Sequence, residues 1–591
     1  MSVRSRMPIR RTFAALVVLP LASIVAAAVA GAQQTPAPAP PSPSPSSAYA
    51  TAVARIAAAA PEAMRRQHAP GMALALVDRR GTIAILSFGE ADIEHHLPVT
   101  PQTRFGIGSI TKSITTIALL QARDRGAFDP QAPVTRYLPW FSVHTRWRPV
   151  TGRDLLTHTS GLPDGGIGYG QPYDVALLRE AHTGFAPGTR WSYSNLGFET
   201  LGAMLEAIDH RDWNTIVRDD VLARIGMTAS APDWTLDSLR SAATGYLPRD
   251  DDRLTDPRSW DFFPVPLTEF SDPAGSVLST AGDMAKYARM LLDGGVTAGG
   301  TRLISPSSYA LLTTAVTTAG TGGVPALYEK YAYGLAVRRF DGDTVIGHTG
   351  GTVAYTACIE ADLSSGFALV ALTNAGDSAD RPCAIVEYGL RSLRAAARRG
   401  ASPVFPAAVD LSEVPHAERL AGTFRSRSGA SLTVVAPSAG RLALRVRSTL
   451  HPLLPVGNGI FFCGLPRYRE SGLRFVSDPR THRARALVAA GVWYAAPGTP
   501  IRPASAPRAW RAYVGHYRYA GAHPYDASLR IQLVNGALVV DDGTPLTPLG
   551  SGEFRLGETW SPERLRFDSV IAGAAQRLSW NGVPLYRVTT P

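Results

Sequence analysis

The stretch Ser109-Ile110-Thr111-Lys112 is the strongest indication of chemistry in this 591-residue chain. Its lysine is rare, because only Lys112, Lys286 and Lys330 among the 59 Lys and Arg residues are lysine. An amine can lose its proton in a desolvated site and act as a base, whereas a guanidinium stays charged. A serine three residues before a lysine, at the start of a helical run, lies on the same helix face. The spacing therefore predicts a serine nucleophile, Ser109, beside an amine base, Lys112.

Two further motifs follow in the order that this chemistry needs. Tyr193-Ser194-Asn195 lies 84 residues after Ser109, and His348-Thr349-Gly350-Gly351 lies 155 residues beyond Tyr193. Taken alone, the tetrapeptide at Ser109 could arise by chance, and the second motif is typical of a turn before a helix. Together, Ser-x-x-Lys, Tyr-x-Asn and a basic residue followed by Thr-Gly resemble the signature of penicillin-recognising serine hydrolases. Their order and spacing are most similar to the class C β-lactamase branch, which also holds D-aminopeptidases, some D,D-carboxypeptidases and a group of carboxylesterases.

The resemblance extends to the sequence between the motifs and covers roughly residues 50–395. It includes Phe105-Gly106-Ile107-Gly108 before the serine, the run Leu155 to Leu162, and Pro273-Ala274-Gly275-Ser276. It implies a β-lactamase-like domain over residues 49–400 with an α+β fold, in which helices flank an antiparallel sheet. A helical insert carries Ser109 and Tyr193 in that fold.

Hydrophobic periodicity places the main elements of this domain. We expect one helix and a strand hairpin at the start of the domain, three helices in its middle, and a second hairpin and a last helix at its end. These are a helix over 53–68, a strand hairpin over 71–88, a helix over 113–124, helices over 200–208 and 281–292, strands over 355–361 and 367–373, and a closing helix over 389–399.

The last 190 residues repeat themselves. Ala421-Gly422-Thr423-Phe424-Arg425 matches Val514-Gly515-His516-Tyr517-Arg518, and Phe461 matches Phe554, both at an offset of 93 residues. Each copy consists of short strands separated by turn residues, which predicts a small antiparallel β-barrel that closes its own edges. The expected domains are one barrel over 410–497 and a second over 508–591, an arrangement similar to that of bacterial D-aminopeptidases.

The N-terminus has the pattern of an export signal. Residues 1–32 combine four arginines, an apolar run and the Ala30-Gly31-Ala32 cleavage pattern, which indicates a signal peptide rather than a membrane anchor. Residues 33–48 are rich in Pro, Ala and Ser and are expected to be a linker. The mature chain is therefore expected to be periplasmic or secreted, without a membrane span.

Composition narrows the possible partners. Removal of the leader lowers the formal charge from +11 to +7, and no basic run contains interleaved aromatic residues, so nucleic-acid binding has no support. No cofactor is implied, and His95 and His96 have no third ligand at metal spacing, so no metal site is expected. Export would permit a Cys358–Cys383 bridge, although buried thiols are an equal alternative.

The resemblance and the chemistry together assign a role to each motif residue. Ser109 is the expected nucleophile, and its backbone N–H and that of Gly351 are the expected oxyanion hole. Lys112 and Tyr193 form a coupled acid–base pair. Repulsion by other cations and partial burial should lower the pKa of the amine, and the same cationic surroundings should lower the pKa of the phenol. Tyr193 is also the expected proton donor to the leaving group. The expected substrate-binding residues are Asn195, His348, Thr349 and Gly350.

His348 is the departure from the pattern that bears on function. β-Lactamases and carboxypeptidases of this group mostly have a lysine there, which binds a substrate carboxylate, whereas histidine is mostly neutral near pH 7. The sequence therefore predicts an exported serine hydrolase for small-molecule or short-peptide substrates, of the D-aminopeptidase kind. A carboxylesterase, a weak β-lactamase or a D,D-carboxypeptidase is the alternative. A penicillin-binding or cell-wall-binding protein with little turnover is a further possibility, with cell-wall material as its partner.

Overall fold

The computed structural model describes residues 49–588 apart from a set of short segments. These segments are 165–170, 249–255, 257–260, 268, 320–327, 377–381, 407–409, 411, 458, 469–471, 501–505, 520–527 and 541–542. The expected signal peptide, residues 1–32, and the expected linker, residues 33–48, lie outside the described residues.

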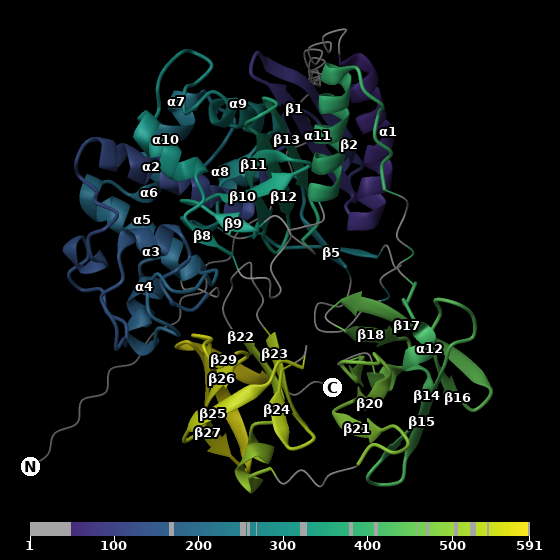
Figure 1. Cartoon of the computed structure of the whole chain (residues 1–591). Coiled ribbons are helices and arrows are strands. Elements are labelled where there is room, and N and C mark those ends of the chain that lie inside the picture. Colours follow the sequence, from purple (N-terminus) through teal and green to yellow (C-terminus); the bar gives the residue numbers. More distant parts are fainter. Residues whose placement is uncertain are drawn as a thin grey trace, which may run out of the picture. The chain divides into compact units, whose positions relative to one another are not determined.

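The described part of the first domain is built on a nine-stranded antiparallel sheet (Figure 1). In spatial order its strands are β3 (Leu97–Pro98), β2 (Gly81–Asp92), β1 (Gly71–Asp78), β13 (Phe367–Thr373), β12 (Thr356–Asp362), β11 (Asp343–Gly351), β10 (Ala336–Phe340), β9 (Lys330–Tyr331) and β8 (Thr317–Thr318). Strands from both ends of the domain meet where β1 pairs with β13, so the sheet joins the N- and C-terminal parts of the domain.

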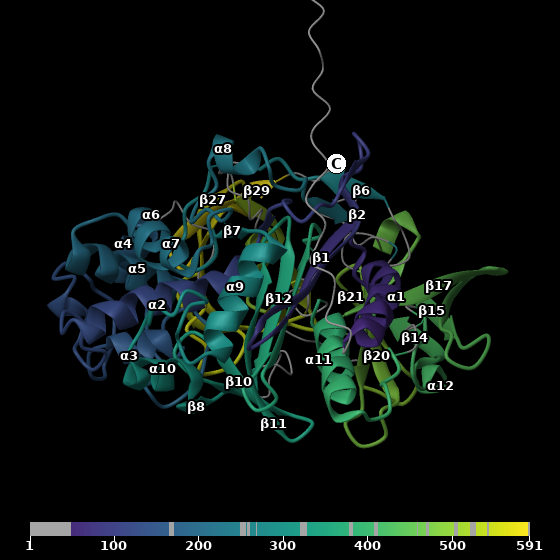
Figure 2. The same ribbon diagram turned by 90° about the horizontal axis from the view of Figure 1, so that it is seen from above.

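Helices cover both faces of this sheet (Figure 2). On one face, α1 (Ala50–Gln67) packs beside α11 (Cys383–Arg398), and on the other lies α9 (Ala281–Leu292). Side chains alternate between the faces along β1: Met72 and Leu74 point to α1 and α11, whereas Ala73 and Ala75 belong to the opposite core. Both cores are apolar, which explains why β1 is buried almost throughout.

A helical region follows the sheet's first strands and carries two of the three motifs. It contains α2 (Thr111–Asp124), α3 (Gly152–Leu156), α4 (Tyr173–Leu177), α5 (Asn195–Asp209), α6 (Trp213–Ile216), α7 (Ala223–Ile225), α8 (Leu236–Leu239) and α10 (Pro306–Thr313). Two short two-stranded ladders accompany it, β4 (Phe105–Gly106) with β7 (Leu278–Ser279) and β5 (Tyr246–Pro248) with β6 (Phe262–Pro264). The buried helix α2 packs against α5, and this brings the first motif, which runs into α2, close to the second motif at the start of α5.

The repeated C-terminal sequence forms two eight-stranded antiparallel barrels, of which the first is closed and the second nearly closed. The first consists of β14 (Gly422–Ser426), β15 (Ser431–Val435), β16 (Ala443–Val446), β17 (Thr449–Gly457), β18 (Ile460–Cys463), β19 (Leu473–Ser477), β20 (Ala484–Ala489) and β21 (Val492–Ala495). The second has the strands β22 (Gly515–Tyr519), β23 (Ser528–Val534), β24 (Ala537–Val539), β25 (Leu546–Gly550), β26 (Glu553–Leu556), β27 (Arg564–Ile571), β28 (Ala574–Trp580) and β29 (Val583–Val588). Its end strands β24 and β25 are joined by an isolated bridge between Val539 and Pro545.

The matched residues of the two copies occupy equivalent places. Phe424 on β14 and Tyr517 on β22 are core residues of their barrels, and so are Phe461 and Phe554. A repeat in sequence therefore encodes a repeat in core packing. The expected α+β architecture, a helix-flanked antiparallel sheet followed by two small barrels, is confirmed.

The bounds of several elements differ from the predicted ones. The closing helix begins at Cys383 rather than at residue 389, because Ile385 and Val386 pack into the core shared with α1. The third motif lies at the end of β11, before the β12–β13 hairpin.

No helix in the described part of the chain is long and apolar enough to cross a bilayer.

Candidate active site

Ser109 lies in a tight turn pressed against the third motif. It belongs to a short 3₁₀ segment, Gly108–Ile110, that leads directly into α2. Gly108 has φ +51°, and a Cβ added there would lie 2.5 Å from the backbone nitrogen of Gly351. A Cβ on Gly350 would lie only 1.9 Å from the carbonyl oxygen of Ile107. The backbones of the two motifs meet at a distance that only glycine permits, which brings Gly351 beside the nucleophile's turn.

The Lys112 amine lies at the centre of a hydrogen-bonded cluster. Its Nζ atom is 3.0 Å from Ser109 Oγ, 2.6 Å from Asn195 Oδ1 and 2.9 Å from the carbonyl oxygen of Ala274. The amide and carbonyl oxygens can only accept hydrogen bonds, whereas a serine hydroxyl can also donate one. A neutral amine therefore gives its two hydrogens to Asn195 and Ala274 and directs its lone pair at the Ser109 hydroxyl. This geometry suits removal of the serine proton.

Burial favours the neutral form of Lys112, which is the form that can act as a base. The side chain is completely buried, and desolvation lowers the pKa of Lys112 to about 8. Asp272, Asp164 and Glu199 oppose this change because their carboxylates stabilise the ammonium form. The predicted lowering by burial is confirmed, whereas the predicted repulsion by other cations is wrong, because the charged neighbours that act on this amine are acidic and desolvation outweighs them.

The pKa of Tyr193 is shifted in the direction opposite to the prediction. Burial raises the pKa of the Tyr193 phenol well above its usual value, and the neighbouring phenols Tyr328 and Tyr331 raise it further. A hydrogen bond with Ser109 acts in the opposite direction but does not reverse the effect. The expected lowering was wrong because burial, which disfavours the charged phenolate, outweighs the cationic surroundings on which the prediction relied. Tyr193 is thus protonated at neutral pH, as a proton donor must be.

The second motif is both a helix start and part of the site. Ser194 caps α5 by accepting the backbone N–H of Gly197, and its own N–H donates to Nδ1 of His158. The next residue, Asn195, places its side-chain oxygen on Lys112. Burial and the charge of Lys112 hold the pKa of His158 well below its usual value, so this ring is a neutral acceptor that orients the motif.

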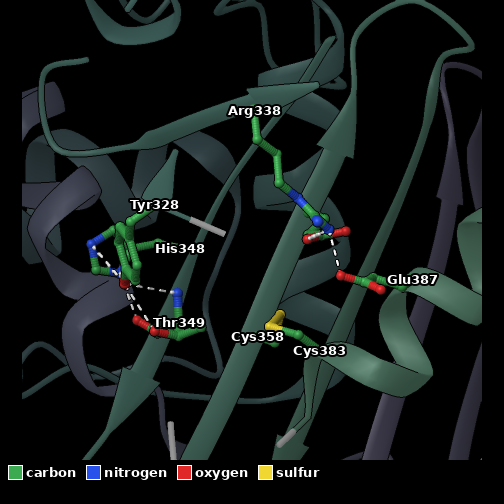
Figure 3. The surroundings of a disulfide bond; sticks show 8 residues. Tyr328, Arg338, His348, Thr349, Cys358, Cys383 and Glu387 are labelled. Carbon is green, nitrogen blue, oxygen red and sulfur yellow. Dashed lines mark hydrogen bonds and ion pairs between the residues drawn. A yellow bond between two sulfur atoms is a disulfide. The ribbon is translucent and has the colours of Figure 1, made fainter. Parts of the chain in front are cut away.

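His348 is buried away from solvent between the rings of Tyr331 and Tyr328, of which Figure 3 shows Tyr328. Its Nε2 atom lies 2.9 Å from the Tyr331 hydroxyl, and its Nδ1 atom lies 2.5 Å from the carbonyl oxygen of Thr349. The Tyr328 hydroxyl lies between His348 and Thr349, 2.8 Å from the Thr349 hydroxyl. Burial, together with the charge of Lys112, lowers the pKa of His348 to about 3. The third motif therefore presents a neutral imidazole whose two nitrogens face protein groups.

Family comparison agrees with the geometry of these three motifs. Residues 56–388 match the Beta-lactamase family, a span that contains Ser109, Tyr193 and His348. The chain belongs to the Beta-lactamase family. The resemblance seen in the sequence is thereby confirmed, and with it the β-lactamase-like fold of the first domain. Relatives in this family are serine hydrolases, and the chain is assigned to the same broad class.

Individual relatives show how broad the family is. Penicillin-binding protein 4 of Amycolatopsis lactamdurans is 31% identical over 332 residues, which cover 53% of this chain and 84% of that protein. Esterase EstB of Burkholderia gladioli is 36% identical over 176 residues, 26% of this chain and 44% of the esterase. The structure of the octameric penicillin-binding protein homologue from Pyrococcus abyssi matches with a TM-score of 0.52 at 22% identity, covering 75% of this chain and 99% of that one. The last comparison shows a shared fold.

Several residues of the site were not anticipated from the sequence. Asp164 contacts Asn195, Ala274 contacts Lys112, and Tyr328 and Tyr331 enclose His348. The family resemblance includes Pro273-Ala274-Gly275-Ser276, but nothing in this segment indicates that the carbonyl oxygen of Ala274 binds the lysine. Among the described residues, no group of three or more His, Cys, Asp or Glu side chains is arranged to hold a metal ion.

A disulfide lies behind the third motif (Figure 3). It joins Cys358 on β12, which pairs with Thr349 on β11, to Cys383 at the start of α11. Of the two alternatives left open by the sequence, the structure has the bridge, and Cys463 remains a buried thiol. Nearby, the buried Arg338 guanidinium on β10 forms ion pairs with Glu360 on β12 and Glu387 on α11. The sheet and α11 are therefore joined by an ion pair as well as by the disulfide.

Proposed function

We propose that this protein is an exported serine hydrolase that cleaves small amides, short peptides or esters through an acyl-enzyme on Ser109. In the first step Lys112 accepts the Ser109 proton, the serine oxygen attacks the carbonyl carbon, and the backbone N–H groups of Ser109 and Gly351 stabilise the oxyanion. The bond between the carbonyl carbon and the leaving group then breaks as Tyr193 gives its proton to the leaving group, and the protonated Lys112 returns a proton to Tyr193. Water attacks the acyl-enzyme and gives a proton to the neutral Lys112. The bond to Ser109 Oγ then breaks, the serine takes that proton back, and the acid is released.

A D-aminopeptidase-like activity is the first candidate, and His348 is the observation that carries it. A substrate with an obligatory carboxylate needs a cation beside the third motif, and the imidazole there is buried and neutral. Asp272 is the acidic group that acts most strongly on Lys112, and its pKa, which burial raises to about 6, leaves it mainly ionised at neutral pH. Its negative charge favours a substrate that brings a positive charge, such as a free amino group, over one that brings a negative charge. Thr349, Gly350 and Asn195 are proposed to hold the substrate's amide.

A carboxylesterase is the second candidate, because Esterase EstB shares the stretch of highest identity among the relatives described above. The test measures initial hydrolysis rates of D-alanine p-nitroanilide and p-nitrophenyl butyrate, each against Ser109→Ala. Anilide cleavage that depends on Ser109 supports the aminopeptidase, and cleavage of the ester alone supports the esterase. If neither these substrates nor a fluorescent penicillin acylates Ser109, the protein is a binding protein with little turnover.

Export is part of this proposal. It is supported by the pattern of residues 1–32 and by the Cys358–Cys383 bridge, since disulfides persist mainly in oxidising compartments. Intact-mass analysis of the protein made from its full gene tests it. A mature chain that begins after Ala32 is expected, and an uncleaved cytoplasmic product would contradict it.

A further inference from the structure

One loop of the second barrel reaches the catalytic domain beside the second motif. This Trp560 loop, residues 557–563, connects β26 to β27. The Trp560 ring lies 5.9 Å from the ring of Phe185, and the Arg190 guanidinium lies 5.6 Å from the Trp560 ring centre. A Cβ on Gly184 would be 2.3 Å from the Trp560 carbonyl oxygen. The loop is therefore packed closely on residues 184–190, the segment that leads into Tyr193.

Glu563, the last residue of this loop, has both of its carboxylate oxygens engaged. Its Oε1 atom accepts the backbone N–H of Asp164 at 2.7 Å. Its Oε2 atom accepts Nε1 of Trp580 at 2.7 Å and Nδ2 of Asn581 at 2.6 Å, and both of these belong to its own barrel. One side chain is thus anchored in the barrel and bonded to the backbone of the catalytic domain.

Asp164 links Glu563 to the catalytic residues through hydrogen bonds with Asn195. Its Oδ1 atom accepts two hydrogen bonds from Asn195, one from the backbone N at 2.9 Å and one from Nδ2 at 3.0 Å. Its carbonyl oxygen accepts the N–H of Leu196 at 3.1 Å. Because Nδ2 is bound to a carboxylate, the amide of Asn195 cannot flip without losing that bond, and its Oδ1 atom stays on Lys112.

We propose that Glu563 of the second barrel is a positioning residue for the catalytic lysine, acting through Asp164 and Asn195. The proposal rests on the proposed function, in which Lys112 activates Ser109. By fixing the Asp164 backbone, Glu563 holds the carboxylate that orients Asn195, and the oriented amide keeps one hydrogen of the Lys112 amine away from Ser109. The second barrel then acts on the rate of acylation without touching the substrate.

The test is a double-mutant cycle in the full-length protein. Glu563→Ala is expected to lower kcat/KM for p-nitrophenyl butyrate about tenfold, since it removes a charged hydrogen-bond acceptor and displaces a reacting group. In the Asn195→Ala background the same substitution is expected to change kcat/KM by less than about twofold, because coupled residues are not additive. Glu558→Ala is the matched control, an exposed glutamate in the same loop, and is expected to leave kcat/KM unchanged.

Two outcomes would overturn the proposal: no loss with Glu563→Ala, or an equal loss in both Asn195 backgrounds, which would indicate a structural effect of the barrel alone. If Glu563→Ala lowers the melting temperature so far that the barrel unfolds, Glu563→Met, which keeps the length of the side chain but has no oxygen to accept the Asp164 N–H, is taken through the same cycle. Ser109→Ala is measured alongside. Turnover that survives Ser109→Ala counts against the proposed hydrolase, whereas additive effects with Ser109-dependent turnover count against the positioning role.

Discussion

Ser109 Oγ lies 3.0 Å from Lys112 Nζ, and the amine's other two hydrogen-bond partners can only accept. The arrangement leaves one role for the serine when the amine is neutral, namely to donate its proton to the nitrogen lone pair. A guanidinium has no lone pair to offer at any accessible pH. The retention of lysine at this position in an arginine-rich chain follows from that difference.

Replacement of Lys112 by arginine is expected to remove activity as fully as replacement by alanine. The charge is kept in Lys112→Arg but the base is lost, and a positioned base contributes about 10²–10⁴-fold. Rates of Ser109 acylation, measured by stopped flow, test this. A Lys112→Arg variant with more than a tenth of the wild-type rate would contradict the assignment of the base.

The pH dependence of kcat/KM is expected to follow the deprotonation of Lys112. The pKa of this amine is lowered by burial to about 8, and the neutral form is the active one, so kcat/KM should rise with pH and level off above about 8. His348, with a pKa near 3, should add no inflection between pH 5 and pH 7. Initial rates from pH 5 to pH 10 check both points, and the melting temperature at each pH serves as the control that the protein is folded throughout.

Tyr193→Phe is expected to affect substrates according to their leaving groups. The high pKa of Tyr193 makes the phenol a proton donor, and an amine leaving group needs that proton, whereas p-nitrophenolate departs without it. We expect a loss of about 100-fold or more in kcat with an amide and less than about tenfold with a p-nitrophenyl ester. Equal losses with both substrates would assign Tyr193 to another step.

Gly350→Ala is expected to abolish activity while the protein remains folded. The added Cβ would meet the carbonyl oxygen of Ile107 at 1.9 Å, so the Ser109 turn and the third motif must separate. A misplacement of about 1 Å can lower a rate 100-fold. Gly282→Ala in α9 is the matched control, because its Cβ would lie 3.8 Å from its nearest neighbour and alanine favours a helix. Circular dichroism and ester hydrolysis of both variants separate folding from catalysis.

The sequence predicted those parts of the molecule that depend on short motifs and on periodicity. Ser109 and Lys112 are one helical turn apart, so their contact follows from spacing alone. The barrels could be inferred because the 93-residue repeat places Phe424 and Tyr517 in equivalent cores. Such features are local, or repeat at a fixed distance.

The remaining parts depend on contacts between distant segments. Nothing near Asp164 in the sequence indicates that it bonds Asn195 on one side and Glu563, 399 residues away, on the other. The pKa of Tyr193 was predicted in the wrong direction because its main cause is burial, to which Tyr328 and Tyr331 from beyond α10 add, and both arise only in the folded chain. Electrostatic surroundings require the tertiary structure.

The Cys358–Cys383 bridge is expected to stabilise the protein without taking part in the reaction. It closes a segment of 25 residues, and the entropy lost by the unfolded chain corresponds to about 3 kcal/mol. Replacement of both cysteines by alanine should therefore lower the free energy of unfolding by about that amount, measured by denaturant titration of the first domain's transition. Since Cys358 pairs with Thr349 on the strand of the third motif, the same variant should also lose activity at a lower temperature than the wild type.

Cys463→Ala is the control for that experiment, because it removes a thiol from the first barrel's core and leaves the bridge intact. It should shift the barrel's transition and leave the temperature at which ester hydrolysis is lost unchanged. Peptide mapping without reductant should recover Cys358 and Cys383 in one linked pair. If both cysteines are recovered as thiols from exported protein, or if the double alanine variant unfolds at the same denaturant concentration as the wild type, the bridge does not contribute to the stability of the folded enzyme.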